Sequence, residues 1–131
     1  YKLQTYLDEG YDHFISGMAQ GIDLIFAETV IQFKEHYDLN IKLECALPCR
    51  NQTDKWNNND IQRYNAILAK ADIITVISEV YNEKCMMERN IYMVDHSNTV
   101  LGFWNGEKHS GTWNTIRYAE LMNKAIDIVR I

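Results

Sequence analysis

Hydrophobic residues follow two different spacings along this chain. Short apolar runs, of the length of buried β-strands, are separated by longer segments in which apolar residues recur every three or four positions, as on one face of an α-helix. The run Ile73–Ile77 consists entirely of β-branched residues, which is typical of a parallel strand buried on both faces. This reasoning predicts strands at His13–Ser16, Ile41–Leu47, Ile73–Ile77, Thr99–Trp104 and Ile126–Ile131.

Helical spacing occupies the segments between these strands. The longest such segment runs from Ile22 to Tyr37, and Gly10 marks the expected end of an earlier helix within Tyr1–Glu9. Since strands and helices alternate, the sequence predicts an α/β fold in three layers, with a mainly parallel sheet and helices on both faces. The other predicted helices are Ile61–Ala71, Met86–Val94 and Trp113–Met122.

One predicted strand differs from the others in its pattern. In Ile41–Leu47, apolar residues alternate with Lys42 and Glu44. Strict alternation is typical of a strand with one face in the core and one face in water. We therefore expect the face that carries Lys42 and Glu44 to be exposed.

Composition narrows the class of protein. The chain has 131 residues, of which 47% are hydrophobic and 24% charged, with a single proline. This length suits one domain, expected over residues 1–131, and the composition excludes disordered and low-complexity classes. No apolar run approaches the roughly 18 residues of a membrane span, and no segment resembles a signal peptide. We therefore expect a cytoplasmic protein with no membrane partner.

Charge and cysteine content bear on possible partners. The net charge is −5, and the basic residues are spread along the chain without a run, which disfavours nucleic acid as the main partner. The three cysteines lack the spacing of a metal site or of a disulfide framework. The four histidines also lack the spacing of metal ligands. We expect reduced thiols and no metal.

The loops that follow the strands hold the candidate chemistry, because ligands of parallel sheets bind beyond the carboxyl ends of the strands. The first loop, Ser16–Asp23, contains Gly17 and Gly21 and leads into a helix, whose free N–H groups favour an anion. Asp23 has two interpretations here. It caps the helix, or its carboxylate accepts hydrogen bonds from ribose hydroxyls.

The loop after the fourth predicted strand also contains glycine and leads into a helix. Ser110, Gly111 and Thr112 precede a helix, and Thr112 either caps that helix or donates its hydroxyl to a phosphate. The pair Arg89 and Asn90 lies within a helix near the same edge of the sheet. Arg89 either binds a phosphate or forms a salt bridge with a carboxylate such as Glu88 or Asp95.

Trp56 ends the long polar loop between the second strand and the following helix. Its indole either stacks on a base or fastens the loop to the body of the protein. Cys49 and Cys85 have no histidine close in sequence, so buried thiols are favoured over nucleophiles.

Four motifs together carry a family resemblance, and they occur in one order along nearly the whole chain. They are SGMAQGIDLIFAE (Ser16–Glu28), LPCRNQTDKW (Leu47–Trp56), MERNIYMVDHS (Met87–Ser97) and SGTWNTIRYA (Ser110–Ala119). With these motifs the chain resembles the YpsA-like branch of the SLOG superfamily, a Rossmann-like group that includes DprA and the LOG cytokinin-activating proteins. The resemblance implies a binding module, acting as a sensor or an enzyme, for a nucleotide-derived ligand such as AMP, ADP-ribose or an NAD-like molecule. No further cofactor is implied.

Two alternative functions follow from the same resemblance. LOG enzymes cleave the N-glycosidic bond of a nucleoside 5′-monophosphate with a PGGxGTxxE loop and an arginine, which Arg89 matches. Thr115 stands at the position of the glutamate, so a nucleotide N-glycosidase would need Asp23 or Glu28 as its carboxylate. The second alternative is a single-stranded DNA binder like DprA, which the acidic balance does not support.

A central first strand is another feature that the resemblance implies. Members of the family begin with such a strand, and no equivalent precedes Tyr1 in this sequence. We therefore expect an N-terminally trimmed domain, with its first strand missing from this chain and part of the ligand site with it. A homodimer is a further partner state that the sequence leaves open.

Overall fold

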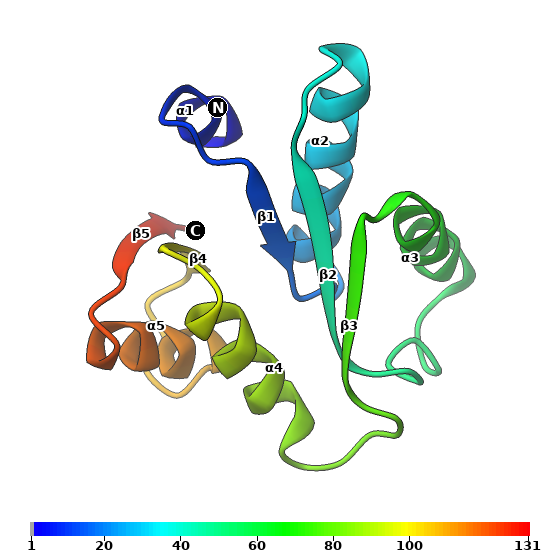
Figure 1. Cartoon of the computed structure of the whole chain (residues 1–131). Helices are drawn as coiled ribbons and strands as arrows, with labels where there is room; N and C mark the ends of the chain where they lie inside the picture. Colours follow the sequence, from blue (N-terminus) through cyan, green and yellow to red (C-terminus); the bar gives the residue numbers. More distant parts are fainter. Residues whose placement is uncertain (1) are drawn as a thin grey trace.

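The computed structural model of the chain describes residues 2–131, and strands and helices alternate through them (Figure 1). The strands begin and end within two residues of the predicted positions. A first short helix ends before Gly10, whose φ of +93° suits the turn expected there. The elements are α1 (Lys2–Asp8), β1 (His13–Ser16), α2 (Ile22–His36), β2 (Lys42–Cys49), α3 (Asn58–Lys70), β3 (Ile73–Ser78), α4 (Cys85–Asp95), β4 (Thr99–Trp104), α5 (Gly111–Leu121) and β5 (Ala125–Arg130).

The strands pair in parallel, as predicted, but they form two sheets. The first sheet has the order β1-β2-β3, with His13 beside Lys42 and Glu44 beside Ile73. The second sheet contains β4 and β5, with Thr99 beside Ala125. Within the described residues, β1 is therefore an edge strand of one sheet and β4 an edge strand of the other.

Helices cover both faces of the first sheet, which confirms the Rossmann-like layered α/β fold. Leu43, Cys45 and Leu47 of β2 share one buried cluster with residues of α2 and α3. Glu44 points to the opposite face, where its carboxylate accepts a hydrogen bond from Tyr92 of α4. Because neighbouring residues of a strand face opposite ways, α4 covers the face opposite to α2 and α3.

The expectation that the Glu44 face is exposed was wrong. Glu44 is only 3% exposed, although Lys42 lies in water as predicted. Its carboxylate accepts hydrogen bonds from Thr75 (2.7 Å) and Tyr92 and contacts His13 Nε2 at 2.9 Å. A buried carboxylate is tolerated when such donors surround it, and the alternating pattern gave no sign of them.

Polar contacts around α1 tie the two sheets together at the amino ends of their strands. Lys2 and Tyr6 of α1 both donate to the Asp127 carboxylate of β5, at 3.0 and 2.5 Å. The hydroxyl groups of Tyr11 and Thr99 share a hydrogen bond between the segment before β1 and the start of β4. None of the helices within residues 2–131 has the length and apolarity needed to cross a membrane.

Candidate functional site

A cavity of about 530 Å³ brings most of the expected site residues together. Both sheets contribute to its walls, as do the amino ends of α2 and α5 and the middle of α4. Its volume is within the range of about 300–1,000 Å³ that is common for small-molecule sites. The expected ligand-binding residues that line it are Ser16, Gly17, Asp23, Arg89, Asn90, Gly111 and Thr112.

The loop after β1 is shaped by its own hydrogen bonds. The Ser16 hydroxyl accepts from the backbone N–H of Met18 at 3.2 Å and donates to the backbone carbonyl of Asp23 at 3.0 Å. Met18 adopts a φ of +60° with its side chain fully buried, and Gly21 adopts a φ of +87°. Ser16 therefore holds the loop in a turn that leads its backbone past the cavity.

Asp23 does not cap α2, which corrects the first interpretation of this residue. Gly21 occupies the N-cap position, and the helix has no side-chain cap. Instead, Asp23 Oδ2 accepts a hydrogen bond from the N–H of Ala19 in the loop, at 3.1 Å. Oδ1 has no hydrogen-bond partner among the described residues, so one oxygen of this cavity-lining carboxylate remains available.

Burial sets the electrostatics of Asp23. It raises the pKa of the carboxyl, while the Ala19 N–H and the nearby Arg89 guanidinium act in the opposite direction. Asp23 is the single Asp or Glu among the residues that line the cavity, and Arg89 is the single Lys or Arg. The cavity therefore offers one hydrogen-bond acceptor with negative charge and one cation.

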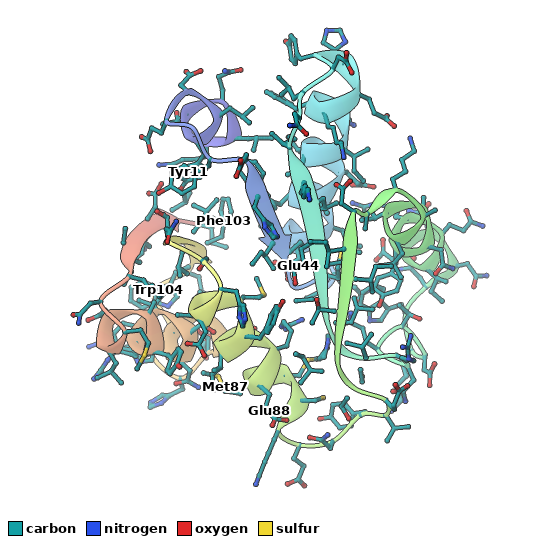
Figure 2. All side chains as sticks on the ribbon, viewed as in Figure 1. Tyr11, Glu44, Met87, Glu88, Phe103 and Trp104 are labelled. Carbon is teal, nitrogen blue, oxygen red and sulfur yellow. The ribbon has the colours of Figure 1, made fainter. Side chains whose placement is uncertain are left out.

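Arg89 lies 6% exposed under the first loop. Its Nη1 donates to the carbonyl of Gly17, and its Nε donates to Asn90 Oδ1 at 2.8 Å. Burial lowers the pKa of the guanidinium, and the Asp23 carboxylate counteracts this. The salt bridge to Glu88 that we considered is not formed, since Glu88 is exposed on the outside of α4 (Figure 2).

Gly17 is required here for space and not for its backbone conformation. A Cβ at this position would lie 3.0 Å from Cζ and Nη1 of Arg89. A larger residue at position 17 would thus require the buried guanidinium to shift. Gly17 and Arg89 form one unit, although 72 residues separate them.

The N-cap of α5 lies two positions earlier than Thr112, the residue that we considered for this role. Ser110, and not Thr112, is the N-cap: its Oγ accepts from the Trp113 N–H at 3.1 Å and donates to the Glu107 carbonyl at 3.0 Å. Thr112 follows in the first turn and lines the cavity. Thr115, at the position of the LOG glutamate, also lines it and donates to the Gly111 carbonyl at 2.9 Å.

Aromatic stacking holds this same loop in place. The rings of Trp104 and Trp113 stack with centroids 5.0 Å apart, and Arg130 and Arg117 lie over their outer faces at 5.4 and 5.6 Å. The indole N–H of Trp104 donates to the Glu107 carbonyl at 2.9 Å. These contacts hold the loop that leads to Gly111 and Thr112 in the cavity wall.

Several expected residues lie elsewhere. Gly21 turns the first loop but is not among the lining residues, and Ser110 is occupied as a cap. Trp56 packs edge-on against Tyr64, with ring centroids 5.3 Å apart, so it fastens its loop to the core. Glu28 forms a two-point ion pair with Arg63, at 2.7 and 3.0 Å, and does not line the cavity.

The cysteines are buried, as the sequence favoured. Cys45, Cys49 and Cys85 are all 0% exposed, and burial raises the pKa of the Cys45 thiol to about 12. Within residues 2–131, no three His, Cys, Asp or Glu side chains gather in a way that would hold a metal ion.

Sequence reasoning missed the strand residues that form much of the cavity wall. They come from the edges of β1 and β4, and in a linear sequence they carry only the pattern of ordinary buried strands. Nothing in the residue types distinguishes them from core residues. They include His13, Ile15, Thr99, Leu101 and Phe103.

Comparison with known proteins identifies the family of this chain. A model of YpsA proteins, described as the YspA SLOG family, matches residues 1–130. The chain belongs to the YpsA family. A UPF0398 protein of Macrococcus caseolyticus (strain JCSC5402) is 38% identical over 74 residues, which are 56% of this chain and 39% of that protein. A UPF0398 protein of Staphylococcus aureus (strain JH9) is 27% identical over 112 residues, 84% of this chain and 59% of that protein.

The matches to the curated relatives cover only part of each relative. The chain spans about two-fifths to three-fifths of the length of these curated relatives. Membership of the YpsA SLOG family is consistent with a nucleotide-related domain. The residues that line the cavity indicate the class of ligand more directly.

Proposed function

We propose that this domain binds a nucleotide-derived ligand, such as AMP, ADP-ribose or an NAD-like molecule, at the end of the cavity formed by the two glycine-containing loops. The observation that carries the proposal is that Gly17, Asp23, Arg89 and Gly111 line one cavity although they come from three distant segments. The YpsA SLOG family, to which the chain belongs, supports the same class of ligand.

The phosphate and the ribose of a nucleotide each have a matching group in this cavity. The first turns of α2 and α5 contribute Ile22, Asp23, Gly111 and Thr112, and helix amino ends favour phosphate through their free N–H groups. The oxygen of Asp23 that has no partner suits ribose hydroxyls, which are donors. Arg89 adds a positive charge under the first loop, where it also orients the Gly17 carbonyl.

Calorimetric titration with AMP, ADP-ribose and NAD⁺ tests this proposal. Asp23→Asn keeps an oxygen for the Ala19 N–H but loses the charge, so the fold should be retained while affinity falls. A hydrogen bond to a charged group contributes about 1.5–3 kcal/mol, so affinity should fall roughly 10- to 150-fold. Glu28→Gln is the matched control, because its carboxylate pairs with Arg63 outside the cavity. Equal affinities of Asp23→Asn and the parent, or no binding of any of the three ligands, would contradict the proposal.

Incubation of the protein with AMP tests the alternative that it is a nucleotide N-glycosidase. An N-glycosidase would release free adenine from AMP, and Asp23 is the carboxylate in the cavity that could stabilise the developing positive charge. Chromatography of the AMP incubations for adenine therefore separates a binding module from a hydrolase. Loss of adenine release in Asp23→Asn, with ligand still bound, would assign the hydrolysis to that residue.

A further inference from the structure

Two of the three buried cysteines lie against each other where a strand ends and a helix begins. Cys49 is the last residue of β2, and Cys85 is the first residue of α4. Their side chains share a hydrogen bond, and both residues are 0% exposed. Two thiols in direct contact have a chemistry that a single buried thiol lacks, because their sulfur atoms can be oxidised to a disulfide.

A short series of hydrogen bonds holds the two sulfur atoms next to each other. The backbone N–H of Asn51 donates to the sulfur of Cys49. Burial first, and then the interaction with Cys85, raise the pKa of the Cys49 thiol, as expected when the Cys49 S–H is the donor to Cys85. Cys85 Sγ in turn donates to the backbone carbonyl of Asn82 at 3.2 Å. The pair is therefore oriented by groups on both sides of it.

Arg89 supplies a positive charge beside this thiol pair. It lies one helical turn after Cys85 on α4. Burial lowers the pKa of its guanidinium, whereas Asp23 and the thiols of Cys85 and Cys49 act in the opposite direction. The guanidinium is thus close enough to both sulfur atoms to stabilise a negative charge on either. Because the thiolate is the form that attacks an oxidant, these surroundings favour oxidation once an oxidant reaches the pair.

The segment in front of α4 controls access to the thiol pair. Residues 79–84 are all exposed, and Val80 and Tyr81 are 65% and 59% exposed. The Tyr81 N–H connects this segment to the loop after β2 by donating to Asn51 Oδ1 at 3.0 Å. A segment with so few buried apolar groups opens locally at a lower free energy than the core. Its opening exposes Cys85 without unfolding the sheet.

We propose that Cys49 and Cys85 are a redox pair that a hydroperoxide oxidises to an intramolecular disulfide. With hydrogen peroxide, the Cys85 thiolate attacks one oxygen, the O–O bond breaks, and the leaving hydroxide takes a proton to form water. The Cys49 sulfur then attacks the sulfenic acid on Cys85, so that an S–S bond forms and a second water leaves with the Cys49 proton. The two sulfur atoms lose two electrons, and the peroxide gains them.

The disulfide has a predictable effect on the fold. It joins β2 to α4 and closes a loop of the chain that contains α3 and β3. Such a cross-link stabilises the folded state mainly by restricting the unfolded chain. The S–S distance in a disulfide is about 2.0 Å, and the two sulfur atoms are already in contact, so only a short movement is needed. Oxidation also fixes the helix from which Arg89 donates to the Gly17 carbonyl.

Peroxide treatment of the whole chain provides the test. The protein is exposed to hydrogen peroxide, catalase stops the reaction, and the free thiols are alkylated in urea so that buried ones react. Peptide mass spectrometry then locates each thiol and any disulfide. We expect Cys49 and Cys85 to enter one disulfide at least ten-fold faster than Cys45 is oxidised. Cys45 is the matched control, because it is equally buried and the charged group that acts on its thiol is the Glu44 carboxylate.

Serine variants separate a thiol pair from a single reactive thiol. The parent and Cys45→Ser should both form the disulfide, with a higher urea midpoint that dithiothreitol reverses. Cys85→Ser keeps a hydroxyl for the Asn82 carbonyl but has no second sulfur, so its urea midpoint should not rise. The peptide map of the parent does not depend on how the variants fold. A disulfide that includes Cys45, a disulfide between two molecules as the main product, or three free thiols in the treated parent would overturn the proposal.

Discussion

Single residues in this protein take roles that their neighbours in space determine. Arg89 shows this most clearly, because it depends on a glycine that lies 72 positions earlier in the chain. Glu44 shows the same, since three polar side chains from β1, β3 and α4 make its burial possible. At this scale the structure makes two predictions, one about space and one about charge.

The first prediction concerns the two loop glycines. Gly17→Ala places a Cβ 3.0 Å from the Arg89 guanidinium, so the free energy of unfolding should fall by about 1–3 kcal/mol, as for other overpacked sites. Gly111→Ala is the matched control, because its Cβ would meet nothing within 4 Å. Urea unfolding of both variants and the parent provides the measurement. Equal losses of stability in the two variants would contradict the role assigned to Gly17.

The second prediction concerns the buried carboxylate of Glu44. Burial alone would raise its pKa, but hydrogen bonds from Tyr92, Thr75 and His13 outweigh this and lower it. A carboxyl with a lowered pKa stabilises the fold above its unfolded pKa, about 4.3, and this stabilisation is lost as the pH falls through the folded value. Glu44→Gln should therefore lower the free energy of unfolding by about 1.5–3 kcal/mol at pH 7.

The pH dependence supplies the check on Glu44. The difference between the parent and Glu44→Gln should shrink as the pH is lowered below about 4.3, because the parent then loses the same charge. Glu79→Gln is the control, since its ion pair with Arg50 is largely exposed and surface pairs contribute roughly 0–1 kcal/mol. Urea unfolding at several pH values measures both variants. A difference for Glu44→Gln that does not change with pH would rule out the carboxylate charge as its cause.

At the scale of single elements, the ends of the helices matter most for the site. The N-cap of α2 is Gly21, which provides no side-chain hydrogen bond, whereas the N-cap of α5 is Ser110, which does. The cap and the Trp104–Trp113 stack together fix the loop that supplies Gly111 and Thr112 to the cavity. The amino end of α5 is thus stabilised by a side-chain cap and an aromatic stack, whereas that of α2 has no side-chain cap.

The prediction at this scale separates Ser110 from Thr112. Ser110→Ala removes the oxygen that accepts from the Trp113 N–H and should lower the free energy of unfolding by about 0.5–2 kcal/mol. Thr112→Ala leaves the cap intact and should change stability less. Thermal unfolding followed by circular dichroism measures both. If Thr112→Ala were the more destabilising variant, the assignment of the cap would be wrong.

At the scale of the whole molecule, the described residues form two parallel sheets connected largely by helices and by contacts at α1. Tyr6 donates to Asp127 across 121 residues, and this hydrogen bond, together with burial, raises the Tyr6 pKa. Tyr11 and Thr99 form the second connection. The cooperativity of unfolding should therefore depend on these tyrosines.

The whole-molecule prediction tests that dependence. In a Tyr6→Phe/Tyr11→Phe double variant, the unit of β4, α5 and β5 should unfold before the rest. In a Trp56→Phe background, Trp104 and Trp113 report on this unit by fluorescence, whereas circular dichroism reports on the whole chain, so the two unfolding curves should separate. Tyr37→Phe is the control, because Tyr37 is 59% exposed. Curves that coincide in the double variant would show that the helices alone couple the sheets.

The elements, the parallel α/β class and the family could all be predicted from the sequence. Hydrophobic spacing located the strands to within two residues, because burial of alternate or continuous apolar positions is a local property of each segment. The motifs also named seven residues that line the cavity, since ligand loops of a parallel sheet lie at the ends of its strands.

How those residues are used depends on the folded arrangement. Asp23 and Thr112 do not act as helix caps, the first of the two interpretations given for each, because Gly21 and Ser110 occupy the cap positions. Glu44 is buried and not exposed, because its hydrogen-bond partners come from β1, β3 and α4, which are distant in the sequence. The division of the strands into two sheets, and the unpaired edges of β1 and β4, are likewise invisible in any single segment. Strand pairing depends on which edges meet in space, and an apolar run is equally suited to a paired or an unpaired edge.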